Sequence, residues 1–132
     1  MSDHGLTAVG VVMDCHDPVA LADFWQAAIG YQTRTGDGQP YVTLSGSDIR
    51  RPLNHLTLQR VPEAKQGKNR THLDLFCTDV AAEVRRLEAL GATVARRVPA
   101  SEGSDDLLMA ELADPEGHEL CVIVRPSRPN QA

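Results

Sequence analysis

The chain has 132 residues, with 18 acidic and 13 basic side chains and a formal net charge of -5. Its 42% hydrophobic and 23% charged content is typical of one globular domain and excludes a disordered or fibrous protein. The longest apolar run, Leu120 to Val124, is too short for a membrane span, and residues 1–10 lack the features of a signal peptide. The acidic balance argues against nucleic-acid binding. We therefore expect a cytoplasmic protein with neither a nucleic-acid nor a membrane partner.

The first half predicts a strand, a helix and three further strands. Alternating apolar residues over 8–15 favour a strand. Asp17 is a suitable N-cap, Pro18 suits the first helical position, and Gly30 can end the helix. The apolar stripe of this helix comprises Leu21, Phe24, Trp25, Ala28 and Ile29. Three strands are then predicted at residues 31–35, 41–45 and 53–60.

The second half repeats this order of elements. Residues 71–77 alternate as a strand, Asp79 caps a helix over 80–90, and Gly91 ends it. The apolar side of this helix comprises Val80, Val84, Leu87 and Leu90. Strands are predicted at residues 93–98, 107–112 and 119–124. We expect His118, in the turn before the last strand, to be exposed.

The two halves share local sequence signals as well as element order. Cys15-x-Asp17 is repeated 62 positions later by Cys77-x-Asp79, and Gly30 is repeated 61 positions later by Gly91. This repeat predicts an α+β fold of two βαβββ modules, at about 6–60 and 70–126, within a single domain over 1–132. Each helix should cover the apolar face of its own sheet, and the opposite faces should line a concave ligand surface.

Candidate site residues follow from that surface. His72 and Asp74 share a strand face and are our candidate catalytic residues, although two residues of strand separate them by roughly 6.6 Å, which is wide for a direct pair. A structural role for His72, hydrogen-bonded across the sheet, is the alternative. The candidate ligand-binding residues are His55, Thr57, Gln59, Phe76, Glu119, Cys121 and Tyr41.

Several strings in this order resemble the vicinal oxygen chelate superfamily, also called the glyoxalase/bleomycin resistance/dioxygenase superfamily. They are Asp17-Pro18…Phe24-Trp25…Ile29-Gly30, His72-Leu73-Asp74-Leu75…Asp79, Leu90-Gly91-Ala92 and Asp114-Pro115-Glu116-Gly117-His118-Glu119. The segment from Gln59 to Arg70 resembles the glyoxalase-like domain branch. The resemblance covers about residues 6–126. It implies two βαβββ modules whose eight strands form an incompletely closed, barrel-like cavity, usually in a homodimer.

The resemblance also implies metal ligands on the first, fourth, fifth and eighth strands, and the chain departs from that pattern. The first-strand position falls on Gly10, which has no side chain, and the eighth falls on Cys121, where a glutamate is usual. His72 matches the fifth-strand position. The fourth-strand position is open between His55 and Gln59. We therefore expect no resident metal; a divalent metal, if one binds, would use His72, His55 and Glu119.

Charge along the chain is uneven around His72. Residues 1–49 hold six acidic groups and one basic, residues 50–72 six basic and one acidic, and residues 73–132 eleven acidic and six basic. The basic block is either a solvated loop and strand edge or a rim that attracts an anion. Its members are Arg50, Arg51, Arg60, Lys65, Lys68 and Arg70.

The three cysteines, Cys15, Cys77 and Cys121, are widely spaced and form no C-x-x-C motif. They are typical of free thiols in a reducing compartment. Cys121 is either a small residue near the pocket floor, a ligand for a soft metal, or a thiolate nucleophile beside a positive neighbour.

Together these observations predict a glyoxalase-like protein that binds a small, anionic molecule between its sheets without a catalytic metal. The alternative is a metal-dependent lyase or dioxygenase that uses His55, His72 and a carboxylate. The substrate is left open by the sequence, since one fold serves many chemistries.

Overall fold

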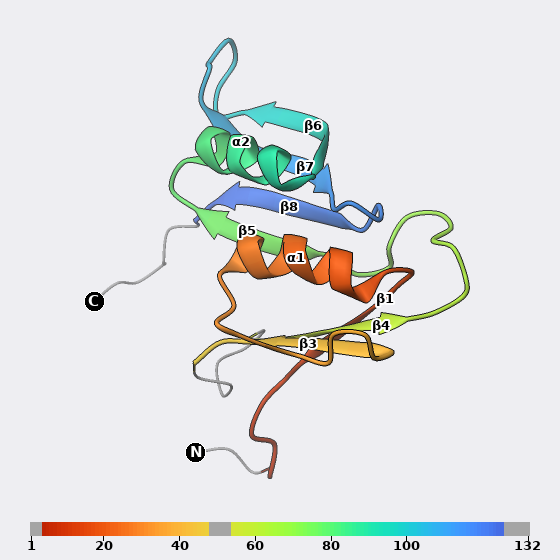
Figure 1. The fold of residues 1–132 in the computed structure, drawn as a ribbon. Helices are drawn as coiled ribbons and strands as arrows, with labels where there is room; N and C mark the ends of the chain where they lie inside the picture. The colour runs from red at the N-terminus through yellow and green to blue at the C-terminus, as the bar shows by residue number, and fades with distance from the viewer. Residues whose placement is uncertain (1–3, 48–53, 126–132) are drawn as a thin grey trace. The chain divides into compact units, whose positions relative to one another are not determined.

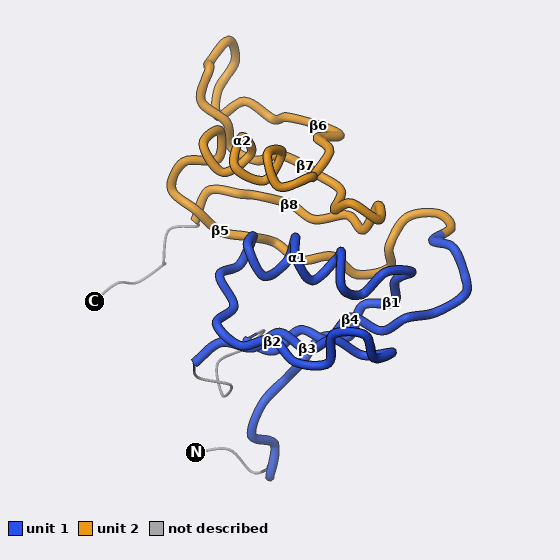
Figure 2. The backbone as a smooth tube through the Cα atoms, viewed as in Figure 1, with its two compact units in different colours: residues 1–65 blue, residues 66–132 orange. Residues whose placement is uncertain are grey.

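A computed structural model gives the fold of the chain and describes residues 4–47 and 54–125. The chain divides into two compact units, residues 1–65 and residues 66–132, shown in different colours in Figure 2. Arg50 and Arg51 of the basic block lie outside the described residues. The described part of each unit has the element order βαβββ, which confirms the predicted α+β fold of two such modules.

Unit 1 is a four-stranded mixed sheet with one helix (Figure 1). Its elements are β1 (Val11–Cys15), α1 (Pro18–Ile29), β2 (Thr33–Thr35), β3 (Tyr41–Ser45) and β4 (His55–Arg60). The strand order is β1-β4-β3-β2, with β1 parallel to β4 and the other neighbours antiparallel. Because the β1–β4 pair is parallel, the chain must cross over between them, and α1 lies in that crossover.

Unit 2 repeats this topology element by element. Its elements are β5 (Leu73–Cys77), α2 (Val80–Leu90), β6 (Thr93–Pro99), β7 (Leu107–Ala113) and β8 (Glu119–Val124). The strand order is β5-β8-β7-β6, and β5 is again parallel to the strand beside it. Each strand of unit 2 therefore has a counterpart in unit 1 at the same place in the sheet.

The two helices begin and end at the residues that the sequence indicates. The Asp17 carboxylate accepts the backbone N–H of Ala20 at 3.1 Å, and Asp79 accepts that of Ala82 at 3.0 Å. Both caps satisfy a donor that has no partner within its own helix. Gly91 ends α2 with a φ of 118°, in the left-handed region that glycine adopts without strain.

The core of each unit lies between the helix and one face of its sheet. In unit 1, Trp25 is fully buried, and its ring meets Phe24 edge-on at a centroid distance of 5.3 Å. In unit 2, Leu87 of α2 is fully buried. The sheet residues buried in the two cores are Val42, Leu44, Leu56 and Leu58 in unit 1 and Ala110, Leu112, Leu120 and Val122 in unit 2.

Four strands are shorter than predicted, and β4 is one of them because it begins at His55 and not at residue 53. β1 begins at Val11 and not at residue 8, β2 begins at residue 33 and not 31, and β5 begins at Leu73 and not at residue 71. A strand exists only where a neighbour pairs with it. The recorded pairing of β1 starts with Val11 against Leu56, and that of β5 starts with Leu73 against Leu120. Gly10 and His72 thus lie just before their strands.

Three predictions about burial are wrong. Ile29 and Leu90, expected in the helix stripes, are 39% and 36% exposed because each is the last residue of its helix. His118, expected at the surface, is buried because its ring Nδ1 lies 3.0 Å from the fully buried Asp114 carboxylate.

In the described part of the chain, no helix is long and apolar enough to cross a membrane.

Candidate functional site

In each unit the sheet face turned away from the helix carries most of the predicted site residues, and we call it the outer face. Side chains alternate between the two faces of a strand, so residues opposite one another in the register share a face. On β1, β3 and β4 the outer-face residues are Val12, Asp14, Tyr41, Thr43, Ser45, His55, Thr57 and Gln59. On β5, β7 and β8 they are Asp74, Phe76, Met109, Glu111, Ala113, Glu119, Cys121 and Ile123.

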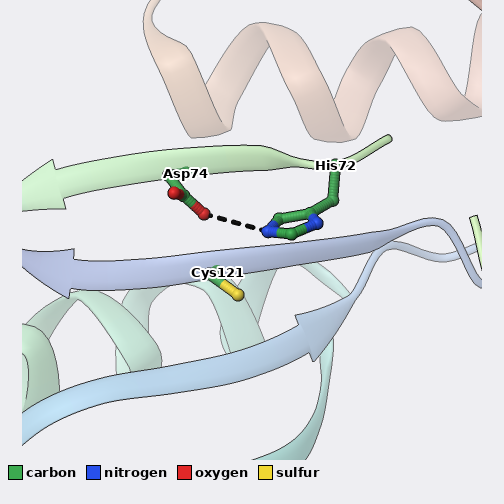
Figure 3. Close-up of side chains that lie close together, drawn as sticks. All are labelled: His72, Asp74 and Cys121. Carbon is green, nitrogen blue, oxygen red and sulfur yellow. Dashed lines mark ion pairs between the residues drawn. The ribbon is translucent and has the colours of Figure 1, made fainter. Parts of the chain in front are cut away.

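Three side chains of unit 2 converge on its outer face (Figure 3): Asp74 of β5, Cys121 of β8, and His72, which directly precedes β5. The Nε2 atom of His72 lies 3.1 Å from Oδ1 of Asp74, and the two side chains are 41% and 47% exposed. One possible ligand atom each from His72, Asp74 and Cys121 lies within 4.8 Å of the other two. The cluster is therefore open to solvent and joins an imidazole, a carboxylate and a thiol.

The backbone explains why this cluster forms. Asp74 and Cys121 are direct register partners across the β5–β8 ladder. His72 precedes the first residue of β5, so its side chain is not held to the spacing of a regular strand. The roughly 6.6 Å expected between positions 72 and 74 overestimates the side-chain separation, because the imidazole turns toward the carboxylate.

Burial raises the pKa of the Cys121 thiol above its ordinary value of 9.0, and the nearby negative charges of Asp74 and Glu111 raise it further. Arg96 and Lys68 act in the opposite direction with smaller effects. The thiol is therefore protonated at neutral pH. This argues against the thiolate nucleophile considered from the sequence, because that role needs a lowered pKa.

Glu111, the register partner of Cys121 on β7, forms an ion pair with Arg96. A β-bulge between Val94 and Arg96 brings Arg96 opposite Glu111. Its guanidinium donates to both carboxylate oxygens, at 3.2 and 3.3 Å. This two-point ion pair engages both Glu111 oxygens, and the positive charge of Arg96 offsets part of the negative charge beside Cys121.

Glu119 does not join the His72 cluster. Its Oε2 accepts the backbone N–H of Asn69 at 2.9 Å. This bond ties the basic segment before β5, which carries Lys65, Lys68 and Arg70, to the start of β8. The residues that geometry brings together are thus His72, Asp74 and Cys121, whereas the sequence suggested His72, His55 and Glu119 as a metal set.

On the outer face of unit 1, His55 lies against a glycine. A Cβ atom at Gly10 would come within 2.7 Å of the His55 ring Nδ1, a distance that a real Cβ does not tolerate. A side chain at position 10 would therefore displace the His55 imidazole from its present position.

The other outer-face residues of unit 1 pair with one another. Gln59 donates to the Tyr41 hydroxyl at 3.2 Å. The hydroxyls of Thr43 and Thr57 are 3.0 Å apart. Thr57 is buried, whereas Tyr41 is 53% exposed.

The strand pairing of unit 1 identifies the residues that correspond to His72, Asp74 and Cys121 of unit 2. Val12 pairs with Thr57 as Asp74 pairs with Cys121, and Gly10 precedes β1 as His72 precedes β5. The counterparts of His72, Asp74 and Cys121 are thus Gly10, Val12 and Thr57. Neither of the two residues considered for the fourth strand, His55 and Gln59, occupies the position that matches Cys121.

Comparison with known proteins gives the family context. The family model described as "Glyoxalase-like domain" matches residues 10–123, which is most of the chain. Among curated proteins, none matches this chain.

Solved structures with the same fold include two described as relatives of glyoxalases. A glyoxalase/bleomycin resistance protein/dioxygenase family enzyme from Burkholderia phytofirmans has a TM-score of 0.62 and 18% identity, over 87% of this chain and 95% of that one. A glyoxalase-related enzyme from Fulvimarina pelagi has a TM-score of 0.64 and 19% identity, over 96% of both chains.

A third structure holds a metal ion and a small anion. A mutant of FosX, the genomically encoded fosfomycin resistance protein from Listeria monocytogenes, has a TM-score of 0.63 and 14% identity, over 93% of this chain and 90% of that one. That protein is in complex with Mn(II) and 1S,2S-dihydroxypropylphosphonic acid. At these identities the likeness to the three structures establishes the fold alone.

Proposed function

This chain belongs to the glyoxalase-like domain family of the glyoxalase/bleomycin resistance/dioxygenase superfamily, and from that premise we propose that it binds a small anionic molecule at His72 on the outer face of unit 2. The observation that supports the proposal is the half-exposed pair of His72 and Asp74, 3.1 Å apart. Such a carboxylate holds an imidazole in one orientation. A protonated imidazole donates a hydrogen bond to an anion and can transfer a proton to it.

The charges around His72 are arranged to admit an anion. Lys65, Lys68 and Arg70 immediately precede it in the sequence. The two nearby glutamates are already engaged, Glu111 by Arg96 and Glu119 by the backbone of Asn69. Flanking positive charge raises the local concentration of an anionic ligand and speeds its association.

A Mn(II) centre like that of the structural neighbour does not fit the residues of this chain. Mn(II) prefers carboxylate oxygen, water and imidazole ligands. The cluster of unit 2 offers a thiol as its third donor, and the counterparts in unit 1, Gly10, Val12 and Thr57, supply neither an imidazole nor a carboxylate. The residues of this chain therefore do not support a lyase or dioxygenase reaction that depends on such a centre.

The test is an NMR titration of the chain in EDTA with inorganic phosphate, methylphosphonate and acetate. Binding should shift the ring resonances of His72 and weaken with added salt. His72→Ala should abolish the response, and Lys68→Ala should weaken it. His16→Ala is the control, because His16 is exposed in unit 1 and bonds the backbone oxygen of Glu63. The proposal fails if no anion shifts His72, or if His72→Ala binds as well as the unaltered chain.

We also propose that the two modules act as one domain, in a cytoplasmic homodimer. The three cysteines form no disulfide, and only Cys15 is buried, which supports a reducing compartment. The homodimer is supported by the resemblance that the sequence carries. Light scattering coupled to size exclusion tests it, and a monomer at micromolar concentration would contradict it.

A further inference from the structure

We propose that His72, Asp74 and Cys121 bind one thiophilic divalent cation, for which Zn²⁺ is the test ion, with every protein ligand supplied by unit 2. This inference goes beyond the proposed function, since it concerns a cation and does not depend on whether an anion binds. The donors of this chain do not suit the Mn(II) that the FosX structure holds, but they do suit a metal that accepts sulfur.

The geometry of the three donors is close to what a tetrahedral ion requires. Ligand atoms at 2.0–2.3 Å from Zn²⁺ lie roughly 3.3–3.8 Å from one another. In the structure Nε2 of His72 and Oδ1 of Asp74 are 3.1 Å apart, and the chosen atoms of all three residues lie within 4.8 Å. A shift of about 1 Å by exposed side chains would complete the arrangement, without movement of the β5–β8 ladder.

The chemistry of the donors selects the kind of ion. Imidazole nitrogen and carboxylate oxygen bind many divalent metals, but a cysteine sulfur favours Zn²⁺ and softer ions over Mn²⁺ and Mg²⁺. Cys121 occupies the position where the resemblance leads us to expect a glutamate. This single exchange replaces a hard oxygen donor with a soft sulfur donor.

Neighbouring carboxylates do not complete the coordination. Glu111 is held by Arg96 at two points, and Glu119 accepts a backbone N–H. Three protein ligands with a fourth position left to water or another small ligand are the pattern of reactive zinc sites, whereas structural sites are closed by four protein ligands.

The experiment uses the 132-residue chain without a histidine tag, stripped with EDTA and then dialysed free of it. Zn²⁺ should bind at one equivalent per chain by calorimetry. Co²⁺ should give the near-ultraviolet sulfur-to-cobalt band of a thiolate ligand. Cys121→Ser should lose that band, and His72→Ala and Asp74→Ala should each weaken Zn²⁺ binding by at least about tenfold, since even groups outside the coordination shell change affinity that much.

Cys77→Ser is the matched control, because Cys77 is a partly buried thiol of β5 on the helix side of the sheet. It should leave the stoichiometry and the cobalt band unchanged. Cys121→Glu should lower the ratio of Zn²⁺ to Mn²⁺ affinity by at least about tenfold, because it restores an oxygen donor. The proposal is overturned if Zn²⁺ does not bind at one equivalent, if Cys121→Ser keeps the cobalt band, or if Cys77→Ser loses it.

These results are separable from those for the anion. Anion binding is measured in EDTA, and Zn²⁺ binding is measured without phosphate or phosphonate. A chain that binds Zn²⁺ but no anion refutes the proposed function and leaves the metal site standing. A chain that binds an anion through His72 but no Zn²⁺ refutes the metal site and leaves the proposed function standing.

Discussion

The two outer faces of this protein have the same strands in the same order but different side chains. Across the sheet of unit 1 runs a row that the register defines as Val12, Thr57, Thr43 and Thr35. The matching row of unit 2 is Asp74, Cys121, Glu111 and Arg96. We call these the hydroxyl row and the charged row.

The difference between the two rows separates the residues that stabilise the fold from those that a ligand can contact. Behind both rows the sheet is covered by a helix and buries small and branched aliphatic residues. The helix-facing residues are thus alike in kind, while the outer faces have diverged. In the hydroxyl row Thr43 and Thr57 are hydrogen-bonded to each other, whereas the charged row holds two of the three donors of the candidate site, Asp74 and Cys121.

The largest loss of stability should come from a substitution in the buried core, which has the same kind of residues in both units. Trp25→Ala removes a fully buried indole from unit 1 and should lower the free energy of unfolding by about 3–5 kcal/mol. Phe76→Ala, on the outer face of unit 2 and 57% exposed, should cost less than about 1 kcal/mol. Urea denaturation measures both. Equal losses would mean that the outer face of unit 2 also contributes to folding.

A double-mutant cycle can test the close approach of the His55 ring to Gly10. Gly10→Ala should destabilise the chain by about 0.5–1.5 kcal/mol, since the imidazole must leave its position or its rotamer. In a His55→Ala background the same change should cost almost nothing. Gly5→Ala is the control, because a Cβ there would meet no atom within 4 Å. An unchanged cost in the His55→Ala background would contradict the contact.

The two rows should differ in what they contribute to stability. Thr57→Val removes a hydrogen bond from the buried Thr57 and should cost about 1 kcal/mol. Arg96→Ala breaks an exposed ion pair of the charged row and should change stability by less than about 0.5 kcal/mol. Thermal unfolding of both variants tests this. A larger loss for Arg96→Ala would mean that the charged row serves the fold as well.

The smallest effect concerns the raised pKa of Cys121. Its folded-state pKa lies above the unfolded value of 9.0. As pH rises past 9.0, the unfolded chain loses the thiol proton first, so the free energy of unfolding should fall slightly until the folded thiol also ionises. Cys121→Ser should remove this part of the pH dependence, as measured by urea denaturation from neutral to alkaline pH.

Reactivity gives a second measure of the same group. At neutral pH, alkylation of Cys121 by iodoacetamide should be slower than that of free cysteine. Asp74→Asn should speed it, because a negative charge that raises the thiol pKa is removed. Mass spectrometry of the labelled peptide measures the rate. Fast labelling that Asp74→Asn does not change would contradict the assignment.

Most of the fold was predictable from the sequence because its signals are local. Asp17 and Asp79 are caps in both prediction and structure, and Gly91 ends its helix as expected. Four of the five residues predicted for the apolar stripe of α1 are buried, namely Leu21, Phe24, Trp25 and Ala28. Local chemistry of this kind requires no knowledge of strand pairing.

The candidate site was harder to predict because it depends on register. That His72, Asp74 and Cys121 lie together follows from the pairing of β5 with β8 and from the start of β5 at Leu73. Spacing along the chain reveals neither. The ion pair that occupies Glu111 depends on a bulge, and the burial of His118 depends on a carboxylate four residues away.

The bulge on β6 has a consequence for how such a site changes during evolution. In an unbroken ladder the residue opposite Glu111 would be Ala95, and Arg96 would point toward the helix. The inserted residue turns the guanidinium to the outer face, where it pairs with one of two neighbouring negative charges. A change of chain length in an edge strand can therefore retune the local electrostatic potential, and with it ligand preference, while every ligating residue stays the same.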